Sequence, residues 1–85
     1  MKSYSNIEKF KVISKQNLLV KDICVLMDCG SSTASYYKRE FMKYCFNNNL
    51  LVLGIPTDIF CEAFGINQDR IIKYAKLESI MQIKN

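Results

Sequence analysis

Apolar residues recur at helical spacing from Val20 onward. Ile23, Leu26 and Met27 fall at positions i, i+3 and i+4, and Cys24 widens the same stripe. Residues with this spacing lie on one face of an α-helix. The pattern therefore predicts a helix that begins near Val20 and buries one side.

A tight turn is expected after this helix. Gly30 is expected to end the helix, because glycine readily adopts the left-handed backbone conformation. Ser31 or Ser32 then offers a side-chain oxygen that accepts a hydrogen bond from a free backbone N–H and caps the next helix. The pattern predicts two helices joined by a short turn.

The second helix, expected over residues 32 to 45, has two contrasting faces. One face gathers a small residue with aromatic and apolar ones: Ala34, Tyr37, Phe41, Tyr44 and Cys45. We expect this face to be buried against the first helix. The opposite face carries hydroxyl and cationic side chains: Ser32, Ser35, Tyr36, Arg39 and Lys43. The sequence thus predicts one core face and one row of hydrogen-bond donors.

A short apolar segment follows a turn of three asparagines. Leu50 to Leu53 are bounded by Gly54 and are expected to form a strand or an extended return. The return from Leu50 to Ile55 could serve as a wing beside the second helix or as a cover that closes the core beneath both helices. No basic residue lies between Asn47 and Pro56, so we favour the cover over a charged wing.

Two further helices are expected toward the C-terminal end. Pro56 tolerates the start of a helix, with Thr57 or Asp58 as its cap and the next glycine as its stop. Asn67 is expected to cap a last helix over about residues 68 to 83. That helix is apolar on more than one side, so it needs more than one partner surface. The rest of the chain or a second copy would supply it.

The chain of 85 residues is long enough for one modest core. We expect a helix-turn-helix domain over residues 18 to 66 and a C-terminal helix over residues 67 to 85 that is a candidate for dimerisation. Residues 1 to 17 fit a short helix or a strand equally well. The predicted fold class is mostly α, with a short extended return and the question of a wing left open.

Composition argues against several classes of protein. No apolar run approaches a membrane span, and the N-terminal stretch lacks a signal-peptide pattern, so a cytoplasmic location is expected. The four cysteines form no CxxC pair, and the chain has no histidine to complete a zinc site. We therefore expect reduced core cysteines, no metal and no cofactor. The cysteines are Cys24, Cys29, Cys45 and Cys61.

Catalytic patterns are also missing from the sequence. The chain has no histidine and no glycine-rich loop that would cradle a phosphate. Asp58 and Glu62 are spaced i, i+4 on one predicted helix, where helix capping by Asp58 accounts for the carboxylate better than acid–base chemistry does. We expect neither an enzyme nor a small-molecule binding protein.

The positive charge is concentrated in one half of the chain. The net charge is +4, and all of the excess falls in residues 1 to 46, because residues 47 to 85 are balanced. A localised positive field suits a phosphate backbone. The basic half contains the predicted row of hydrogen-bond donors.

Two segments resemble a known group of proteins. KDICVLMDCGSSTASYYKREF and LGIPTDIFCEAFGI are similar to the small helix-turn-helix proteins of phages and integrative elements, many of them excisionase-like or regulators. The resemblance covers about residues 19 to 66. The chain departs from the excisionase pattern at Leu19, where a capping threonine is usual. It departs again at Asp28, which holds the place of the glycine that usually ends the first helix, two positions before Gly30.

The resemblance implies a role for the helix over residues 32 to 45. It would correspond to the recognition helix, and the side chains directed at double-stranded DNA would be Ser32, Ser35, Tyr36, Arg39 and Lys43. Arginine can donate two parallel hydrogen bonds to a guanine edge, whereas serine and tyrosine hydroxyls suit phosphates. Lys21 and Lys38 would add non-specific attraction, together with Lys43.

Two functions follow as hypotheses. The first is a DNA-binding protein of a phage or mobile element, acting in excision or transcription control, with a dimer, adjacent copies or a recombinase partner supplying further affinity. The alternative is a protein-interaction module that uses the same scaffold to bind a host or replication protein, because fold does not dictate function.

Overall fold

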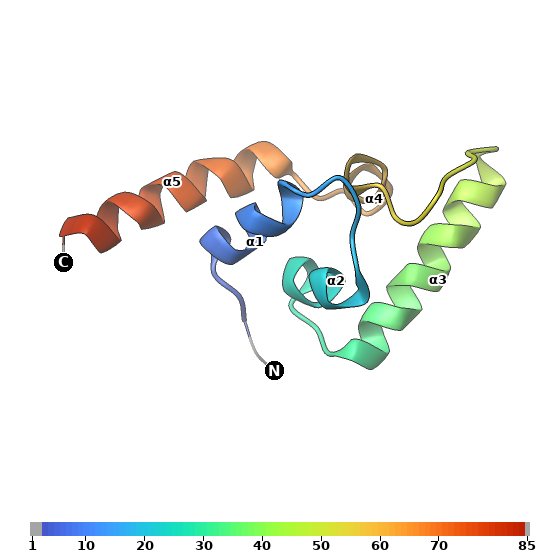
Figure 1. Cartoon of the computed structure of the whole chain (residues 1–85), viewed down its shortest axis with the longest axis horizontal. Coiled ribbons are helices and arrows are strands. Elements are labelled where there is room, and N and C mark those ends of the chain that lie inside the picture. The colour runs from blue at the N-terminus through green and yellow to red at the C-terminus, as the bar shows by residue number, and fades with distance from the viewer. Residues whose placement is uncertain (1–2, 85) are drawn as a thin grey trace.

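The computed structural model describes residues 3–84, with the side chains of residues 3–81. Over that part of the chain the fold is mostly helical and contains no strand (Figure 1). The helices are α1 (Asn6–Ile13), α2 (Val20–Met27), α3 (Ser31–Asn47), α4 (Thr57–Ala63) and α5 (Gln68–Lys84). The expectation of a mostly α fold is confirmed. None of these described helices is long and apolar enough to cross a membrane.

The helices form an elongated molecule with principal dimensions of 47, 25 and 18 Å. α5 packs on α1, and α1 packs on α2. α3 packs against α2 and α4, so that α3 and α5 lie at opposite ends with the three shorter helices between them (Figure 1). Ile23, Phe41 and Phe60 are fully buried and mark the centre of the core.

The N-terminal segment, for which the sequence leaves helix and strand open, forms helix α1. Ser5 caps this helix, because its Oγ accepts a hydrogen bond from the backbone N–H of Glu8 at 3.1 Å. Val12 is buried on α1, and Ile71 and Ala75 are buried on α5, where the two helices pack together. α1 therefore covers one side of α5.

Leu19 occupies the N-cap position of α2 but has no side-chain oxygen to cap the helix, and Asp22 stabilises the helix start instead. The carboxylate of Asp22 accepts a hydrogen bond from the backbone N–H of Leu19 at 2.8 Å. The side chain of Asp22 is only 8% exposed, and its carboxylate forms an ion pair with Lys15 at 2.5 Å. A buried carboxylate with two donors thus anchors the N-terminal end of α2, where the leucine side chain provides no cap.

The turn between α2 and α3 differs from the expectation for Gly30. Asp28, rather than Gly30, adopts the left-handed conformation that ends α2, with φ 50° and ψ 51°. Gly30 has φ −84°, so the prediction for this glycine is wrong. Aspartate tolerates the left-handed region better than most residues, because its short side chain can hydrogen-bond locally. The backbone N–H of Cys29 donates to the carbonyl oxygen of Cys24 at 3.1 Å and closes the helix end.

α3 begins at Ser31, and Gly30 occupies its N-cap position without a side-chain hydrogen bond. The predicted cap at Ser31 or Ser32 is therefore wrong. The helix starts one residue before the predicted range and takes both serines into its first turn. Both residues are exposed, so the free backbone N–H groups of this turn are open to solvent.

The inner face of α3 is largely the predicted one. Ala34, Phe41 and Cys45 are buried. Tyr37 and Tyr44 pack against the core but are only half-buried, less than predicted. Tyrosine suits the edge of a buried stripe, because its ring is apolar and its hydroxyl is polar.

Aromatic contacts hold α3 on α4. The ring centroids of Phe41 and Phe60 are 5.7 Å apart, and those of Phe60 and Phe64 are 4.6 Å apart. Phe64 meets Tyr37 edge-on at 5.4 Å. Tilted and edge-on arrangements at these distances are favourable beyond the area they bury. The contacts fix the side of α3 that faces the core, and hence the side that faces solvent.

The segment between α3 and α4 forms no strand within the described residues. Leu51 and Leu53 are 101% and 92% exposed, so the predicted cover over the core is wrong for these leucines. Ile55, the last residue of the predicted cover, is buried in the core, and Val52 is partly buried against it, so the prediction is confirmed for these two residues. Pairing is limited to an isolated antiparallel bridge between Asn17 and Pro56. The rest of the segment has no partner strand, and its leucines remain in solvent.

The predicted caps of α4 are wrong, and that of α5 is confirmed. Pro56 occupies the N-cap position of α4 without a side-chain hydrogen bond. Thr57 is the first residue of the helix, and its Oγ1 donates to the carbonyl oxygen of Lys15 at 2.6 Å, so it ties α4 to the segment before α2. Asn67 Oδ1 accepts a hydrogen bond from the backbone N–H of Arg70 at 3.0 Å, as expected of a helix cap.

Candidate nucleic-acid interface

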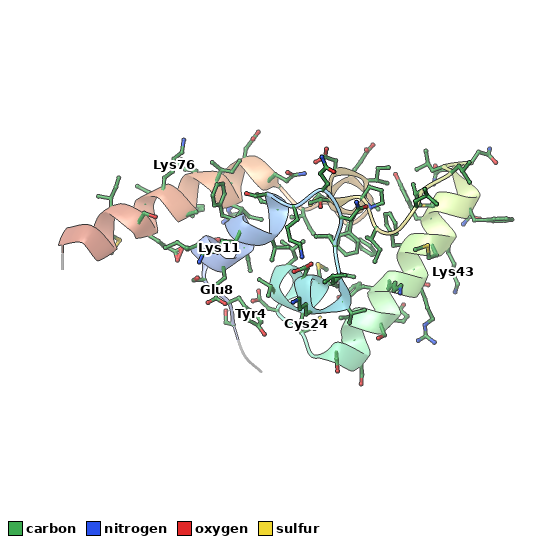
Figure 2. All side chains as sticks on the ribbon, in the orientation of Figure 1. Tyr4, Glu8, Lys11, Cys24, Lys43 and Lys76 are labelled. Atoms are coloured by element: carbon green, nitrogen blue, oxygen red, sulfur yellow. The ribbon has the colours of Figure 1, made fainter. Side chains whose placement is uncertain are left out.

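Most of the predicted site residues lie on one exposed face of α3, here called the outer face: Ser32, Ser35, Tyr36, Arg39 and Lys43. Tyr36 is 50% exposed, and the side chain of Lys43 is 75% exposed. Lys43 extends from the side of α3 that is turned away from the other helices (Figure 2). The structure therefore gathers hydroxyl and cationic groups on one accessible surface.

The two remaining predicted residues flank this surface. Lys38 is exposed at the edge of the outer face, and Lys21 is exposed near the start of α2. An open hollow between α2 and α3 is lined by Val20, Ser35, Lys38, Arg39, Met42 and Lys43. Lys38 is thus brought together with the α3 residues. Lys21 does not line the hollow and lies beside its Val20 wall.

Arg39 is an unengaged donor group on the outer face. Among the described residues, none forms an ion pair or a hydrogen bond with its guanidinium group. All five N–H donors of the group are therefore free for a ligand. Their planar fork matches the two acceptors of a guanine edge or the oxygens of a phosphate.

Glu40 is part of the site and is absent from the sequence-based prediction. Its Oε1 accepts a hydrogen bond from the Tyr36 hydroxyl at 3.3 Å, and its Oε2 forms an ion pair with Lys43 Nζ at 3.2 Å. The spacings i−4 and i+3 place these partners one helical turn away on either side. That spacing is a signal the sequence already contains. The outer face is consequently not uniformly positive.

A group of exposed apolar side chains adjoins the C-terminal part of α3. Phe46 is 83% exposed, and Met42 is 39% exposed. Leu51 and Leu53, in the connection to α4, are almost entirely exposed. The sequence pattern predicts that these leucines cover the core, so the apolar surface they form is a second feature that the periodicity missed.

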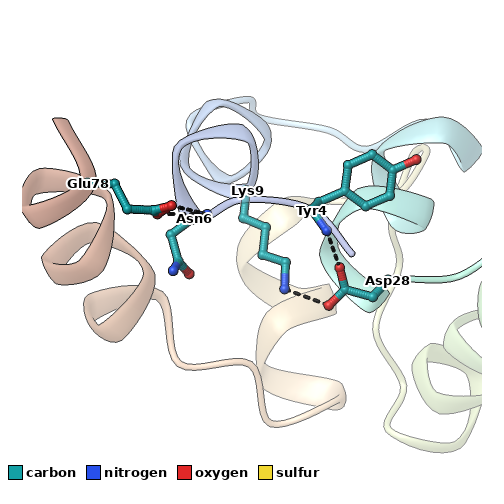
Figure 3. A network of polar contacts seen from close by, with 5 residues as sticks. All are labelled: Tyr4, Asn6, Lys9, Asp28 and Glu78. Carbon is teal, nitrogen blue, oxygen red and sulfur yellow. Dashed lines mark hydrogen bonds and ion pairs between the residues drawn. The ribbon is translucent and has the colours of Figure 1, made fainter. Parts of the chain in front are cut away.

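A polar network supports the turn that leads into α3 (Figure 3). Asp28 accepts a hydrogen bond from the backbone N–H of Tyr4 at 2.8 Å and forms an ion pair with Lys9 at 2.7 Å. Glu78 of α5 accepts a hydrogen bond from the backbone N–H of Asn6 at 3.0 Å. Together these contacts tie the start of α1 both to α5 and to the turn before α3.

The protonation of Asp28 reflects these contacts. Partial burial alone would raise the pKa of its carboxyl group, but the hydrogen bonds from Lys9 and from the N–H of Tyr4, with the positive charge of Lys9, hold the pKa below its usual value. Asp28 is therefore ionised at neutral pH and acts as a fixed acceptor beside the turn.

The described residues do not assemble a site for disulfide, metal or acid–base chemistry. The cysteines are free thiols, and burial raises the pKa of Cys61 to about 11, so its thiol is protonated at neutral pH. The described residues contain no cluster of three potential metal ligands. Asp58 does not cap α4; its carboxylate accepts a hydrogen bond from Gln68 at 3.3 Å.

Comparison of the chain with protein-family models, with curated proteins and with solved structures gave no match.

Proposed function

We propose that the protein binds double-stranded DNA, with α2 and α3 acting as a helix-turn-helix unit and the outer face of α3 lying in the major groove. The observation that carries the proposal is the unengaged guanidinium of Arg39 in the middle of an exposed face of hydroxyl and cationic groups. A helix presented in this way reads base edges through its outward side chains. The proposed function is binding alone, without catalysis.

Some of the contacts would recognise base edges, and others would position the protein on the phosphate backbone. Arg39 would donate to a guanine in the groove. Ser32, Ser35 and Tyr36 would hold phosphates through their hydroxyl groups, because such contacts set the register of a protein on the duplex. Lys21, Lys38 and Lys43 would add attraction that depends on salt but not on sequence. The aromatic contacts between α3 and α4 would keep the outer face rigid during binding.

A single module of this size needs help to bind tightly. α5 offers one surface for it, since Leu77, Ile80 and Met81 in its C-terminal half are 46%, 50% and 65% exposed. A homodimer, adjacent copies on repeated sites or a recombinase could dock there. Such a protein would act in the cytoplasm of a host cell, on the DNA of a phage or mobile element, in excision or in transcription control.

The test compares two arginine variants in a fluorescence-anisotropy titration of labelled duplexes at two salt concentrations. Arg39→Ala should cost about 1–3 kcal/mol on the preferred duplex and relax sequence preference. Arg70→Ala is the matched control, because Arg70 lies on α5 and its guanidinium stacks on Tyr74 at 5.5 Å. This variant should retain the sequence preference.

The salt dependence separates specific recognition from simple charge. Wild-type affinity should fall steeply as salt rises, because Lys and Arg contacts release counterions from the phosphates. Equal losses for Arg39→Ala and Arg70→Ala would contradict the proposal. So would an affinity for duplex DNA no higher than that of an unrelated lysine-rich domain.

A protein partner is the second candidate, and the exposed apolar side chains favour it. Met42 belongs to the hollow beside α2, and Phe46 projects from the last turns of α3. Exposed apolar surface of this kind marks interaction sites. In this reading Phe46→Ser would abolish a stoichiometric complex with a host or replication protein and leave duplex binding at the level of the wild type.

A further inference from the structure

Glu40 places a negative charge at the edge of the outer face. Its side chain is 34% exposed, and it lies between Tyr36 and Lys43, to which it is bonded at 3.3 and 3.2 Å. Each carboxylate oxygen engages one partner and retains a further acceptor position. Glu40 can therefore accept another hydrogen bond from a ligand without releasing the two side chains it holds.

A carboxylate at this place opposes binding to phosphate alone. It repels the polyanionic backbone, and it holds Lys43 Nζ in an ion pair that a phosphate would have to replace. A face built only for charge attraction would lack such a group. The cost falls on every duplex equally, irrespective of sequence.

A hydrogen-bond donor on one base can offset that repulsion. The exocyclic amino group of cytosine is the major-groove donor to which Glu and Asp pair, whereas arginine pairs with the two acceptors of guanine. Arg39 and Glu40 are consecutive on α3, so their side chains leave the helix about 100° apart and reach different base positions. A site that satisfies both side chains needs a guanine for Arg39 and a cytosine nearby for Glu40.

We infer that Glu40 is a specificity-determining residue of the outer face: it weakens binding to arbitrary duplexes and favours duplexes that offer a cytosine amino group beside the guanine contacted by Arg39. The inference rests on the proposed DNA binding and identifies the kind of duplex that is preferred.

The experiment uses the full chain and two variants that each remove one negative charge. Glu40→Gln keeps the shape of the side chain, and Glu62→Gln is the matched control, because Glu62 is exposed on α4 and forms no ion pair among the described residues. The probes are a random-sequence duplex and the best duplex selected by the wild type from a random pool. Affinities are measured over a salt series, with circular dichroism to check the fold of each variant.

The two variants should then diverge. Glu40→Gln should bind the random duplex more tightly than Glu62→Gln does, with the slope of log K against log salt steeper by about 0.9, as expected if the freed Lys43 gains one phosphate contact. Its preference for the selected duplex should fall about 5- to 150-fold, the discrimination of one base contact. The selected duplex itself should contain guanine with a neighbouring cytosine.

Two results would overturn the inference while leaving the proposed function intact. In the first, Glu40→Gln behaves as Glu62→Gln does on both duplexes. In the second, Glu40→Gln loses affinity for both duplexes to the same degree, which would make Glu40 a support for Tyr36 and Lys43 alone. Failure of the wild type to bind any duplex in a salt-dependent way would instead refute DNA binding itself, and this inference with it.

Discussion

At the scale of single residues, Asp28 determines how the chain enters α3. It adopts a left-handed conformation at φ 50° and receives donors from Lys9 and from the backbone of Tyr4. A short side chain that tolerates this conformation is needed here, and an ionised one is held in place by its partners. Asp28 thus ends α2 through its backbone conformation and ties α1 to this turn through its charge.

Replacing Asp28 with asparagine separates these two roles. Asparagine also tolerates the left-handed region, but it cannot form the ion pair with Lys9, so Asp28→Asn should lose about 0.5–1 kcal/mol of unfolding free energy at pH 7. The folded pKa of Asp28 is lowered from 3.8, so its contribution is present above about that pH and is lost as the pH falls through the lower folded value.

Urea unfolding of both proteins from pH 7 down to pH 2 measures this effect. The difference between wild type and Asp28→Asn should be constant near neutrality and vanish in strong acid. A difference that persists unchanged to pH 2 would show that the charge of Asp28 does not stabilise the fold.

The role of Asp28 could not be predicted from local sequence. Local rules favour glycine for a left-handed residue, and Gly30 was the obvious choice two positions later. The partners that hold Asp28 lie 24 and 19 residues away in sequence, at Tyr4 and Lys9. Glu40, in contrast, has partners at i−4 and i+3 within one helix, so helical spacing alone could have found it.

At the scale of helices, the orientation of α3 depends on its aromatic contacts with α4. Phe60 is fully buried and lies against both Phe41 and Phe64. Removing its ring leaves a cavity at the junction of the two helices, and such cavities are costly because neighbouring side chains relax only partly. The outer face of α3 is therefore held indirectly by a residue on another helix.

Phe60→Ala should lower the unfolding free energy by about 3–5 kcal/mol, measured by urea denaturation. The same substitution at Phe46, which is 83% exposed, is the control and should change stability by less than about 0.5 kcal/mol. Comparable losses at the two positions would contradict the packing described for α3 and α4.

Helices with strong periodicity were predictable, and their connections were not. The apolar periodicity predicted both α2 and α3 and the buried positions Ile23, Ala34 and Phe41. A helix with one buried side repeats its apolar residues at fixed intervals. For the return over residues 50 to 55, the predicted burial is wrong at Leu51 and Leu53 and is confirmed at Ile55. A short run of leucines has no period that distinguishes a buried return from an exposed loop, and pairing there depends on a segment more than 30 residues earlier.

At the scale of the whole molecule, the outer face of α3 and the exposed part of α5 lie at opposite ends of a body 47 Å long. α1 connects them, because Glu78 holds its first turn while Lys9 holds the turn before α3. In the proposed function, one end binds DNA while the other remains open to a second molecule. The proposed function uses this separation.

The central claim is that duplex DNA binds to the outer face of α3. The most direct test is a titration of the ¹⁵N-labelled protein with a short duplex, followed by two-dimensional ¹H–¹⁵N NMR. Amide shifts should change most at Ser32, Ser35, Tyr36, Arg39 and Lys43, and the changes should diminish as salt is raised. Shifts confined to α5 or to residues 46 to 53, with α3 unaffected over residues 32 to 43, would contradict the claim.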